Sequence, residues 1–358
     1  MKAIALFLTV VTQLSAQTTT QRLPAPNGRL NVEFSDLTTI RELADGRVLL
    51  FDRKEERLVV GDFPSGSVYD VARKGQGPAE FEFIATLLPL AGDTTIAADM
   101  TRRWLILVGD SVVRKVLPEH SALQRALQPL GADQNARILT QDFPGSWSAP
   151  SESTLAVLVH RGSGAADTIA RMALGGGRNR ISTGTTTGGR AISVRRIPLQ
   201  AWETPLLFFD GWVAIARLDP YRVDWRAPDG RWSLGKSLSA RPMRMSDAEK
   251  AAYIKRNPWS RNATDWPREL PPFENPVTLL ASPDGRLVVK RLPTLAEPGT
   301  RYDVIDRAGN RVGQIVLPEN EYLLGFGARS VYVVVTDGDG IQRLRRHPMY
   351  ASLRPGHY

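Results

Sequence analysis

The chain of 358 residues contains no cysteine and only four histidines. The absence of cysteine excludes disulfide bonds, thiolate zinc sites, cysteine nucleophiles and a lipid-modified N-terminal cysteine. No histidine lies four residues from another, so there is little material for a histidine-rich metal site. The serine-hydrolase motif G-x-S-x-G is missing, and so are long helical periodicities. These absences favour a β-rich protein without familiar catalytic chemistry.

The first residues have the pattern of a secretory signal peptide. Lys2 supplies a positive charge, residues 3–14 form an apolar run, and Ser15 and Ala16 are small. This run is too short for a membrane span, which needs about 20 residues. We expect a signal peptide over residues 1–16, cleaved after Ala16, a linker over 17–29, and a periplasmic or extracellular protein. No later run is apolar enough to predict a transmembrane segment.

The charge balance is basic, with 46 Lys and Arg against 37 Asp and Glu and a net charge of +9. A basic balance is typical of nucleic-acid binding, but the predicted export argues against that class of partner. An exported basic protein more often meets acidic polysaccharide, lipid headgroups or acidic protein. We therefore expect no nucleic-acid partner, an anionic ligand or protein partner, and a monomeric chain.

Short β-patterned runs dominate the rest of the sequence. Each is rich in Val, Leu and Ile and is bounded by turn residues. The runs are residues 47–51, 58–62, 105–108, 155–159, 213–217, 287–290 and 331–335. Hairpin turns of the Asp-Gly type, such as Asp284-Gly285, supply the positive φ angles that tight hairpins need. The pattern predicts an all-β chain of antiparallel hairpins.

A degenerate unit of four strands recurs at a spacing of roughly 40–50 residues, which is typical of propeller blades. The units are residues 35–73, 83–117, 130–174, 201–238, 276–317 and 322–346. The last unit has three evident strands, and residues 30–34 form an orphan strand before the first. We predict a six-bladed β-propeller of four-stranded antiparallel blades over residues 30–348. In this prediction the orphan strand completes the last blade and closes the ring, and residues 349–358 are a C-terminal tail.

Residues 241–272 do not fit the repeat and are predicted to be an insertion between the fourth and fifth blades. A capping box at Ser246 and Glu249 predicts a helix of about ten residues that ends near Arg256. An aromatic and proline-rich loop follows. Arginines beside tryptophans suit stacking and anion contacts. The candidate ligand-binding residues are Lys255, Trp259, Arg261, Trp266 and Arg268.

One loop carries a resemblance to a known family. The residues Gly75, Gln76, Gly77, Pro78, Ala79, Glu80 and Phe81 follow one unit and precede the next. This stretch resembles the G-x-G-P-G-E-F loop of secreted six-bladed propellers related to NHL-repeat proteins, with Ala79 where that family has Gly. The resemblance implies a propeller and says little about activity, because propellers host enzymes, receptors and scaffolds. A strand follows the loop, so a structural turn is favoured over a phosphate site, and we expect Phe81 to pack between two blades.

Two functions are compatible with the sequence. We favour a non-catalytic binding or scaffold module without a cofactor, because no nucleophile or paired acid and base stands out. The alternative is a calcium-dependent hydrolase or lyase with a metal in the central channel, where hard oxygen ligands would hold the ion. The candidate ligands at the starts of inner strands are Asp36, Glu42, Glu82, Glu203, Glu274 and Asn275.

Overall fold

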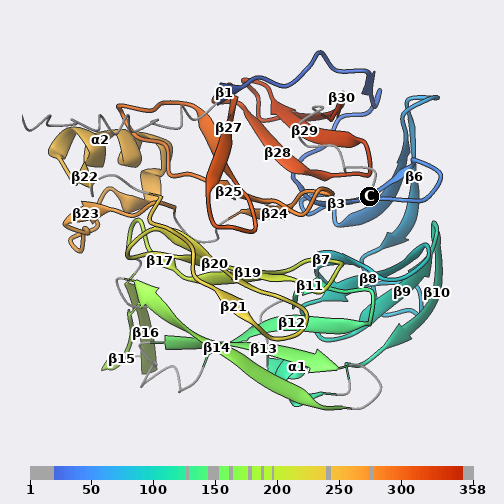
Figure 1. Ribbon diagram of the computed structural model, residues 1–358, viewed down its shortest axis with the longest axis horizontal. Coiled ribbons are helices and arrows are strands. Elements are labelled where there is room, and N and C mark those ends of the chain that lie inside the picture. Colours follow the sequence, from blue (N-terminus) through green and yellow to red (C-terminus); the bar gives the residue numbers. More distant parts are fainter. Residues whose placement is uncertain are drawn as a thin grey trace, which may run out of the picture.

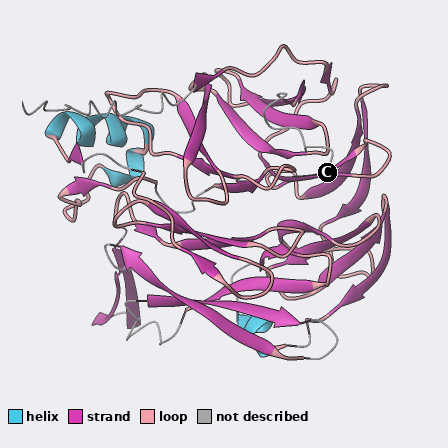
Figure 2. Cartoon of the chain, viewed as in Figure 1, coloured by secondary structure: helices cyan, strands magenta, loops and turns pink. Residues whose placement is uncertain are grey.

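The computed structural model describes residues 20–118, 120–125, 129–143, 153–160, 164–175, 180–186, 189–195, 197–238, 243–273 and 278–349. The predicted signal peptide and, apart from Met349, the predicted tail lie outside these residues. Strands make up nearly all of the regular structure, and the few helices lie at its periphery (Figure 2). No helix of the described residues has the length and apolarity that crossing a membrane requires. The all-β prediction is confirmed.

Six antiparallel sheets follow one another along the chain and form the blades of a propeller (Figure 1). Blades 1 and 2 contain β3 (Leu37–Glu42), β4 (Val48–Asp52), β5 (Arg57–Asp62) and β6 (Ser67–Arg73), then β7 (Ile84–Pro89), β8 (Thr94–Asp99), β9 (Trp104–Val108) and β10 (Ser111–Val116). Blades 3 and 4 contain β11 (Pro129–Ala132), β12 (Arg137–Asp142), β13 (Ser153–His160) and β14 (Ala166–Gly175), then β18 (Thr204–Leu207), β19 (Val213–Arg217), β20 (Arg222–Arg226) and β21 (Trp232–Ser233). Blades 5 and 6 contain β24 (Leu279–Ala281), β25 (Leu287–Lys290), β26 (Thr300–Ile305) and β27 (Arg311–Leu317), then β28 (Glu321–Phe326), β29 (Ser330–Thr336) and β30 (Gln342–Pro348).

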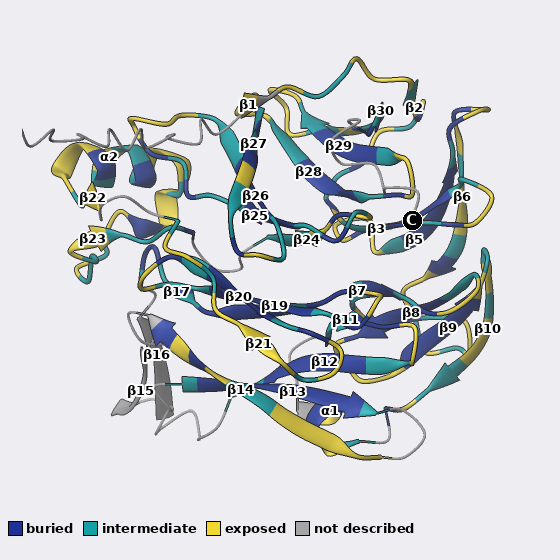
Figure 3. Cartoon of the chain, viewed as in Figure 1, coloured by how far each residue is buried: buried dark blue, intermediate teal, exposed yellow. Residues whose placement is uncertain are grey.

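The innermost strands of the six blades contact one another in ring order. β3 contacts β7, and the series continues through β11, β18, β24 and β28 back to β3. The core lies between neighbouring blades, so the middle strands are buried on both faces; all five residues of β4 are buried. Outer strands such as β6 and β10 are largely exposed (Figure 3). The apolar runs of the sequence are therefore blade-to-blade contacts.

The N-terminal segment closes the ring by adding a strand to blade 6, as predicted. β2 (Gly28–Arg29) pairs antiparallel with β30, and the Phe34 N–H donates to the carbonyl of Gln342 at 2.9 Å. Leu30 and Phe34 are each 3% exposed, in a cluster with residues of blades 1 and 6. The pairing begins at Gly28, slightly before the predicted strand, and both Leu30 and Phe34 add backbone hydrogen bonds to β30 as well as apolar contacts.

Three other segments differ from the expectations. The stretch interpreted as a linker contains β1 (Thr20–Gln21), which pairs in parallel with β27, as well as β2. Between blades 3 and 4 the chain forms a hairpin of β15 (Arg180–Thr186) and β16 (Gly189–Arg195). β17 (Ala201–Trp202) then joins the sheet of blade 3 rather than starting blade 4. A short helix, α1 (Ser121–Arg125), precedes blade 3.

Candidate functional site

The insertion between blades 4 and 5 has a base strand pair and a helix. β22 (Met243–Arg244) pairs with β23 (Glu269–Leu270), and α2 (Asp247–Arg256) and η1 (Pro258–Ser260) lie between them. The N–H of Glu249 donates to Ser246 Oγ at 3.1 Å, which satisfies one free donor of the first helical turn. The predicted helix and its N-terminal cap are confirmed. In Figure 1 the helix lies at one side of the ring.

The insertion is fixed to the fifth blade by buried contacts. Tyr253, on the inner face of α2, is 5% exposed and clusters with Leu199 and Leu292. The ring of Trp266 lies edge-on to that of Tyr253, with centroids 5.7 Å apart. At the start of the helix, Glu249 accepts a hydrogen bond of 2.9 Å from the N–H of Leu295. These contacts hold the helix against the loop that follows β25.

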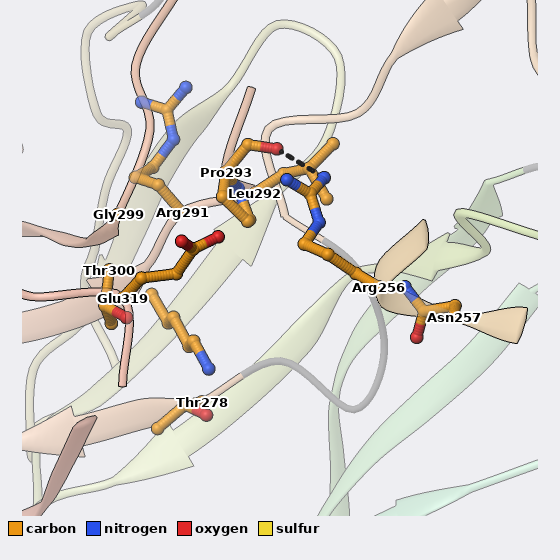
Figure 4. A pocket seen from close by; sticks show the side chains of 10 residues that line it. Arg256, Asn257, Thr278, Arg291, Leu292, Pro293, Gly299, Thr300 and Glu319 are labelled. Atoms are coloured by element: carbon orange, nitrogen blue, oxygen red, sulfur yellow. Dashed lines mark hydrogen bonds between the residues drawn. The ribbon is translucent and has the colours of Figure 1, made fainter. Parts of the chain in front are cut away.

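A pocket of about 240 Å³ lies where the end of α2 meets blade 5 (Figure 4). Its walls come from the helix end, from the segments around β24, β25 and β26, and from the connection to blade 6. The lining residues are Arg256, Asn257, Thr278, Lys290, Arg291, Leu292, Pro293, Gly299, Thr300 and Glu319. Three of them are cationic and one is acidic, so the lining carries a net positive charge.

Arg291 is part of the framework of this pocket. Its Nη1 donates to the buried carboxylate of Asp303 at 2.8 Å, and its Nε donates to the carbonyl of Pro272 at 3.0 Å. Burial opposes the charge of this guanidinium, but the carboxylate of Asp303 outweighs that effect and the pKa of Arg291 is raised. Asp303 also accepts a hydrogen bond from the Tyr221 hydroxyl. This network ties blade 4 to blade 5 beneath the pocket.

Arg256 and Glu319 face the pocket with fewer partners. One terminal nitrogen of Arg256 donates to the carbonyl of Pro293 at 3.1 Å, which leaves further N–H groups of this exposed side chain for a ligand. Glu319 is exposed and makes no hydrogen bond or ion pair with any residue that the structure describes. Figure 4 shows its carboxylate directed toward the middle of the group.

None of the five predicted ligand-binding residues lines this pocket. Lys255, Arg261 and Arg268 are exposed elsewhere on the insertion, and Trp259 is 46% exposed. Trp266 packs on Tyr253 and donates its indole N–H to the carbonyl of Ala263 at 3.0 Å. The insertion contributes Arg256 and Asn257 instead, and the other lining residues come from blade 5 and its connection to blade 6.

The candidate calcium ligands do not converge in the described structure. Asp36 pairs with Arg53, with the closest nitrogen–oxygen distance at 2.6 Å, and Glu203 pairs with Arg217 at 2.7 Å. Glu42 is the last residue of β3, at the opposite end of that strand from Asp36, and it accepts a hydrogen bond from the Tyr332 hydroxyl.

The other candidates do not complete a set. Glu82 accepts a hydrogen bond from the side chain of Gln76. Glu274 and Asn275 lie outside the described residues. Among the described residues, no group of three or more His, Asp or Glu side chains could hold a metal ion.

The loop over residues 75–81 is a structural turn between blades 1 and 2. Glu80 folds back to accept the N–H of Gly77 at 2.8 Å, and its carboxylate occupies the space beside Gly75 where a Cβ would lie. The Lys115 ammonium donates to the carbonyl of Gly77 at 3.0 Å. Pro78 and Ala79 form the tip of the turn, and Ala79 is not among the residues with a positive φ angle.

Phe81, at the end of this loop, is fully buried. Its ring lies edge-on to that of Phe51, with centroids 5.4 Å apart. The cluster around the pair contains residues of blades 1 and 2. Phe81 therefore packs between two blades and forms no part of a ligand site.

Comparisons with known proteins find similar structures only. No family model matches the chain, and no curated protein matches it. A solved structure described as an exported protein from Bacteroides fragilis is 11% identical and has a TM-score of 0.50, with 93% of this chain and 99% of that one covered.

Two further solved structures are more distant. One is described as a gluconolactonase and is 10% identical, with a TM-score of 0.48 and coverage of 92% of this chain and 96% of that one. The other is a calcium-binding regucalcin from Agrobacterium tumefaciens, 11% identical, with a TM-score of 0.41 and coverage of 94% and 98%. At 11% identity the exported protein supports the fold alone, and the chain is a six-bladed β-propeller with a helical insertion beside blade 5.

Proposed function

We propose that this protein is an exported, non-catalytic propeller that binds an anionic ligand on the side of the ring that carries the insertion. The observation that carries the proposal is the pocket between α2 and blade 5, with Arg256, Lys290 and Arg291 in its lining. Binding sites tend to lie on decorations of a rigid frame, and this insertion is held to the frame by buried contacts.

The size of the pocket limits what enters it. Small-molecule pockets usually enclose about 300–1,000 Å³, and this one, at about 240 Å³, lies just below that range. It therefore receives a single anionic group or chain end rather than a protein surface. An acidic polysaccharide, a lipid headgroup or an acidic protein could present such a group.

Export is the second part of the proposal. It rests on the signal-peptide pattern around Lys2 and on the loop over residues 75–81, which resembles that of secreted propellers related to NHL-repeat proteins. We propose a monomer acting in the periplasm or outside the cell. N-terminal sequencing of the mature protein tests the export: a chain that begins after Ala16 supports it, and an intact Met1 in the cytoplasm contradicts it.

Isothermal titration with anionic ligands tests the binding function. The panel contains oligogalacturonate, inorganic phosphate and an acidic peptide, each at low and at physiological salt. We expect at least one of them to bind the wild type, more weakly at higher salt, and to lose affinity about tenfold or more in the double variant Arg256→Gln, Lys290→Gln. If no anion binds, or if the double variant binds as the wild type does, this function is wrong.

A calcium-dependent hydrolase or lyase remains the second candidate. Its support is the description of one structure of similar fold as a gluconolactonase and of another as a calcium-binding regucalcin. In this chain Asp36 and Glu203 each bind a separate arginine. Elemental analysis with calcium titration separates the candidates, because a tightly held stoichiometric divalent ion would favour the second over the binding module.

A further inference from the structure

The pocket beneath the insertion holds charges of both signs at separate places. Arg256 comes from the end of α2, whereas Glu319 comes from the connection between β27 and β28. The two side chains approach from different elements, with Pro293 and Leu292 between them in the view of Figure 4. Arg256 and Glu319 therefore present a positive and a negative group to the pocket from different sides.

An acidic side chain in an anion pocket changes which anions bind. A plain anion beside Glu319 meets a like charge, which opposes binding. A ligand that offers a hydrogen-bond donor to this carboxylate gains a charge-assisted bond instead. Glu319 therefore favours anions that also carry a hydrogen-bond donor at the end opposite their anionic group over anions that lack one.

The remaining polar lining suits a ligand rich in donors and acceptors. Thr278 and Thr300 present hydroxyls, which both donate and accept, and Asn257 presents an amide. The amide nitrogen of Asn257 donates to the carbonyl of Tyr253 at 3.3 Å, which orients the side chain. With a volume near 240 Å³, the space suits a molecule about as large as one sugar ring or one amino acid.

We infer that the pocket selects a small carboxylate that carries hydroxyl or ammonium donors on its far side, with Arg256 binding the carboxylate and Glu319 the donors. A sugar acid at a polysaccharide end and a free amino acid share this chemistry. The inference rests on the proposed function, because it assigns the ligand class of the same pocket.

Titration calorimetry with four matched probes tests the inference. Galacturonate has a carboxylate and hydroxyls, alanine has a carboxylate and an ammonium group, acetate has a carboxylate alone, and galactose has hydroxyls alone. We expect galacturonate or alanine to bind the wild type about tenfold or more tightly than acetate and galactose. Which of the first two binds more tightly identifies the source of the donors.

The variant Glu319→Gln tests the role of the acid. This variant should bind the tighter of galacturonate and alanine about tenfold more weakly, because the charge-assisted hydrogen bond to the donors is lost. It should bind acetate more tightly than the wild type does, because the like charge of Glu319 is gone. Glu269→Gln is the matched control, because Glu269 is exposed on β23 and does not line the pocket; it should leave both affinities unchanged.

Failure of this inference differs from failure of the proposed function. If anions bind and the double variant of Arg256 and Lys290 abolishes binding, but Glu319→Gln leaves the order of the probes unchanged, the ligand class is wrong and the binding function stands. If acetate binds the wild type as tightly as galacturonate and alanine do, the ligand class is also wrong. If no anion binds the wild type, both are wrong.

Discussion

Single buried side chains connect neighbouring blades, and Phe81 is the clearest case. It is fully buried, and its ring meets Phe51 of blade 1 at the start of blade 2. Because neither blade covers this surface alone, the side chain contributes to the cohesion of the ring rather than to one sheet.

Truncation of Phe81 measures this contribution. Phe81→Ala should destabilise the protein by about 3–5 kcal/mol, which is the usual cost of removing a buried phenylalanine ring. Equilibrium unfolding in urea gives the value. Phe209→Ala is the control, because Phe209 is 43% exposed. Equal losses for the two variants would contradict the assigned role of Phe81.

The pH dependence of stability should report on Asp110. Hydrogen bonds from the Tyr69 hydroxyl and the Arg47 guanidinium lower the pKa of Asp110 from its ordinary 3.8 to about 2. Because the folded-state pKa is depressed, the stabilisation is fully present above about pH 5 and is lost as the pH falls through the unfolded-state value of 3.8 toward 2.

The comparison with Asp110→Asn isolates this carboxylate. The wild type should exceed the variant in unfolding free energy by a constant amount between pH 5 and 7. That difference should shrink between pH 4 and 2. Urea unfolding at a series of pH values measures it, and a difference that grows on acidification would show that the assigned pKa direction is wrong.

At the level of residues, the sequence predicted the buried position of Phe81 correctly but did not predict which residues line the pocket. Phe81 follows a recognisable loop and precedes a strand, which places it between blades. Lys255 and Arg256 are adjacent on a helix, and only Arg256 lines the pocket. The sequence around them is polar on several sides of the helix, so it does not fix the rotation of α2, and Glu319 reaches the pocket from another blade connection.

The closing strand is the element on which the ring most depends. Removing residues 20–34 would expose the edge of β30 and uncover the surface that Leu30 and Phe34 fill. The truncated protein should melt at a markedly lower temperature and aggregate more readily. The double variant Leu30→Ala, Phe34→Ala, in the full chain, should lower the melting temperature in the same direction. Melting at the wild-type temperature in both would contradict the closure.

The insertion should behave as an element that is docked on the ring. Tyr253 supplies its buried centre, against Leu199 and Leu292. Tyr253→Ala should raise hydrogen exchange and protease cleavage within residues 243–270 while the blades stay protected. Trp232→Ala is the control, since Trp232 is 37% exposed on β21, outside the insertion, and should change exchange within residues 243–270 little. Loosening of the whole ring by Tyr253→Ala would mean that the insertion is not a separate docked element.

Sequence patterns predicted the regular elements and missed the atypical ones. Short, nearly continuous apolar runs beside Asp-Gly turns mark most of the middle blade strands, and the glycine of such a turn, as at Gly285, adopts the positive φ that the turn needs. The β15–β16 hairpin lies in a stretch rich in Gly, Ser and Thr, which contains no such apolar run. The two-residue strand β1 is too short to carry any pattern.

For the whole molecule, the repeat alone determined the architecture. Six units that cannot bury both faces by themselves must close into a ring, and the first and last blades are therefore joined by the N-terminal strand. The pocket could not be predicted in the same way. It forms where the insertion, three strands of blade 5 and a blade connection meet, and no single stretch of sequence contains that arrangement.

The most direct test of the central claim compares two adjacent cations of α2 by titration calorimetry with galacturonate and alanine at low salt. Arg256 lines the pocket and Lys255 does not, although both lie in the last helical turn. We predict that Arg256→Gln weakens binding of the tighter ligand about tenfold or more, whereas Lys255→Gln binds it as the wild type does. Equal affinities for the two variants, or a loss confined to Lys255→Gln, would contradict the assignment of this pocket as the binding site.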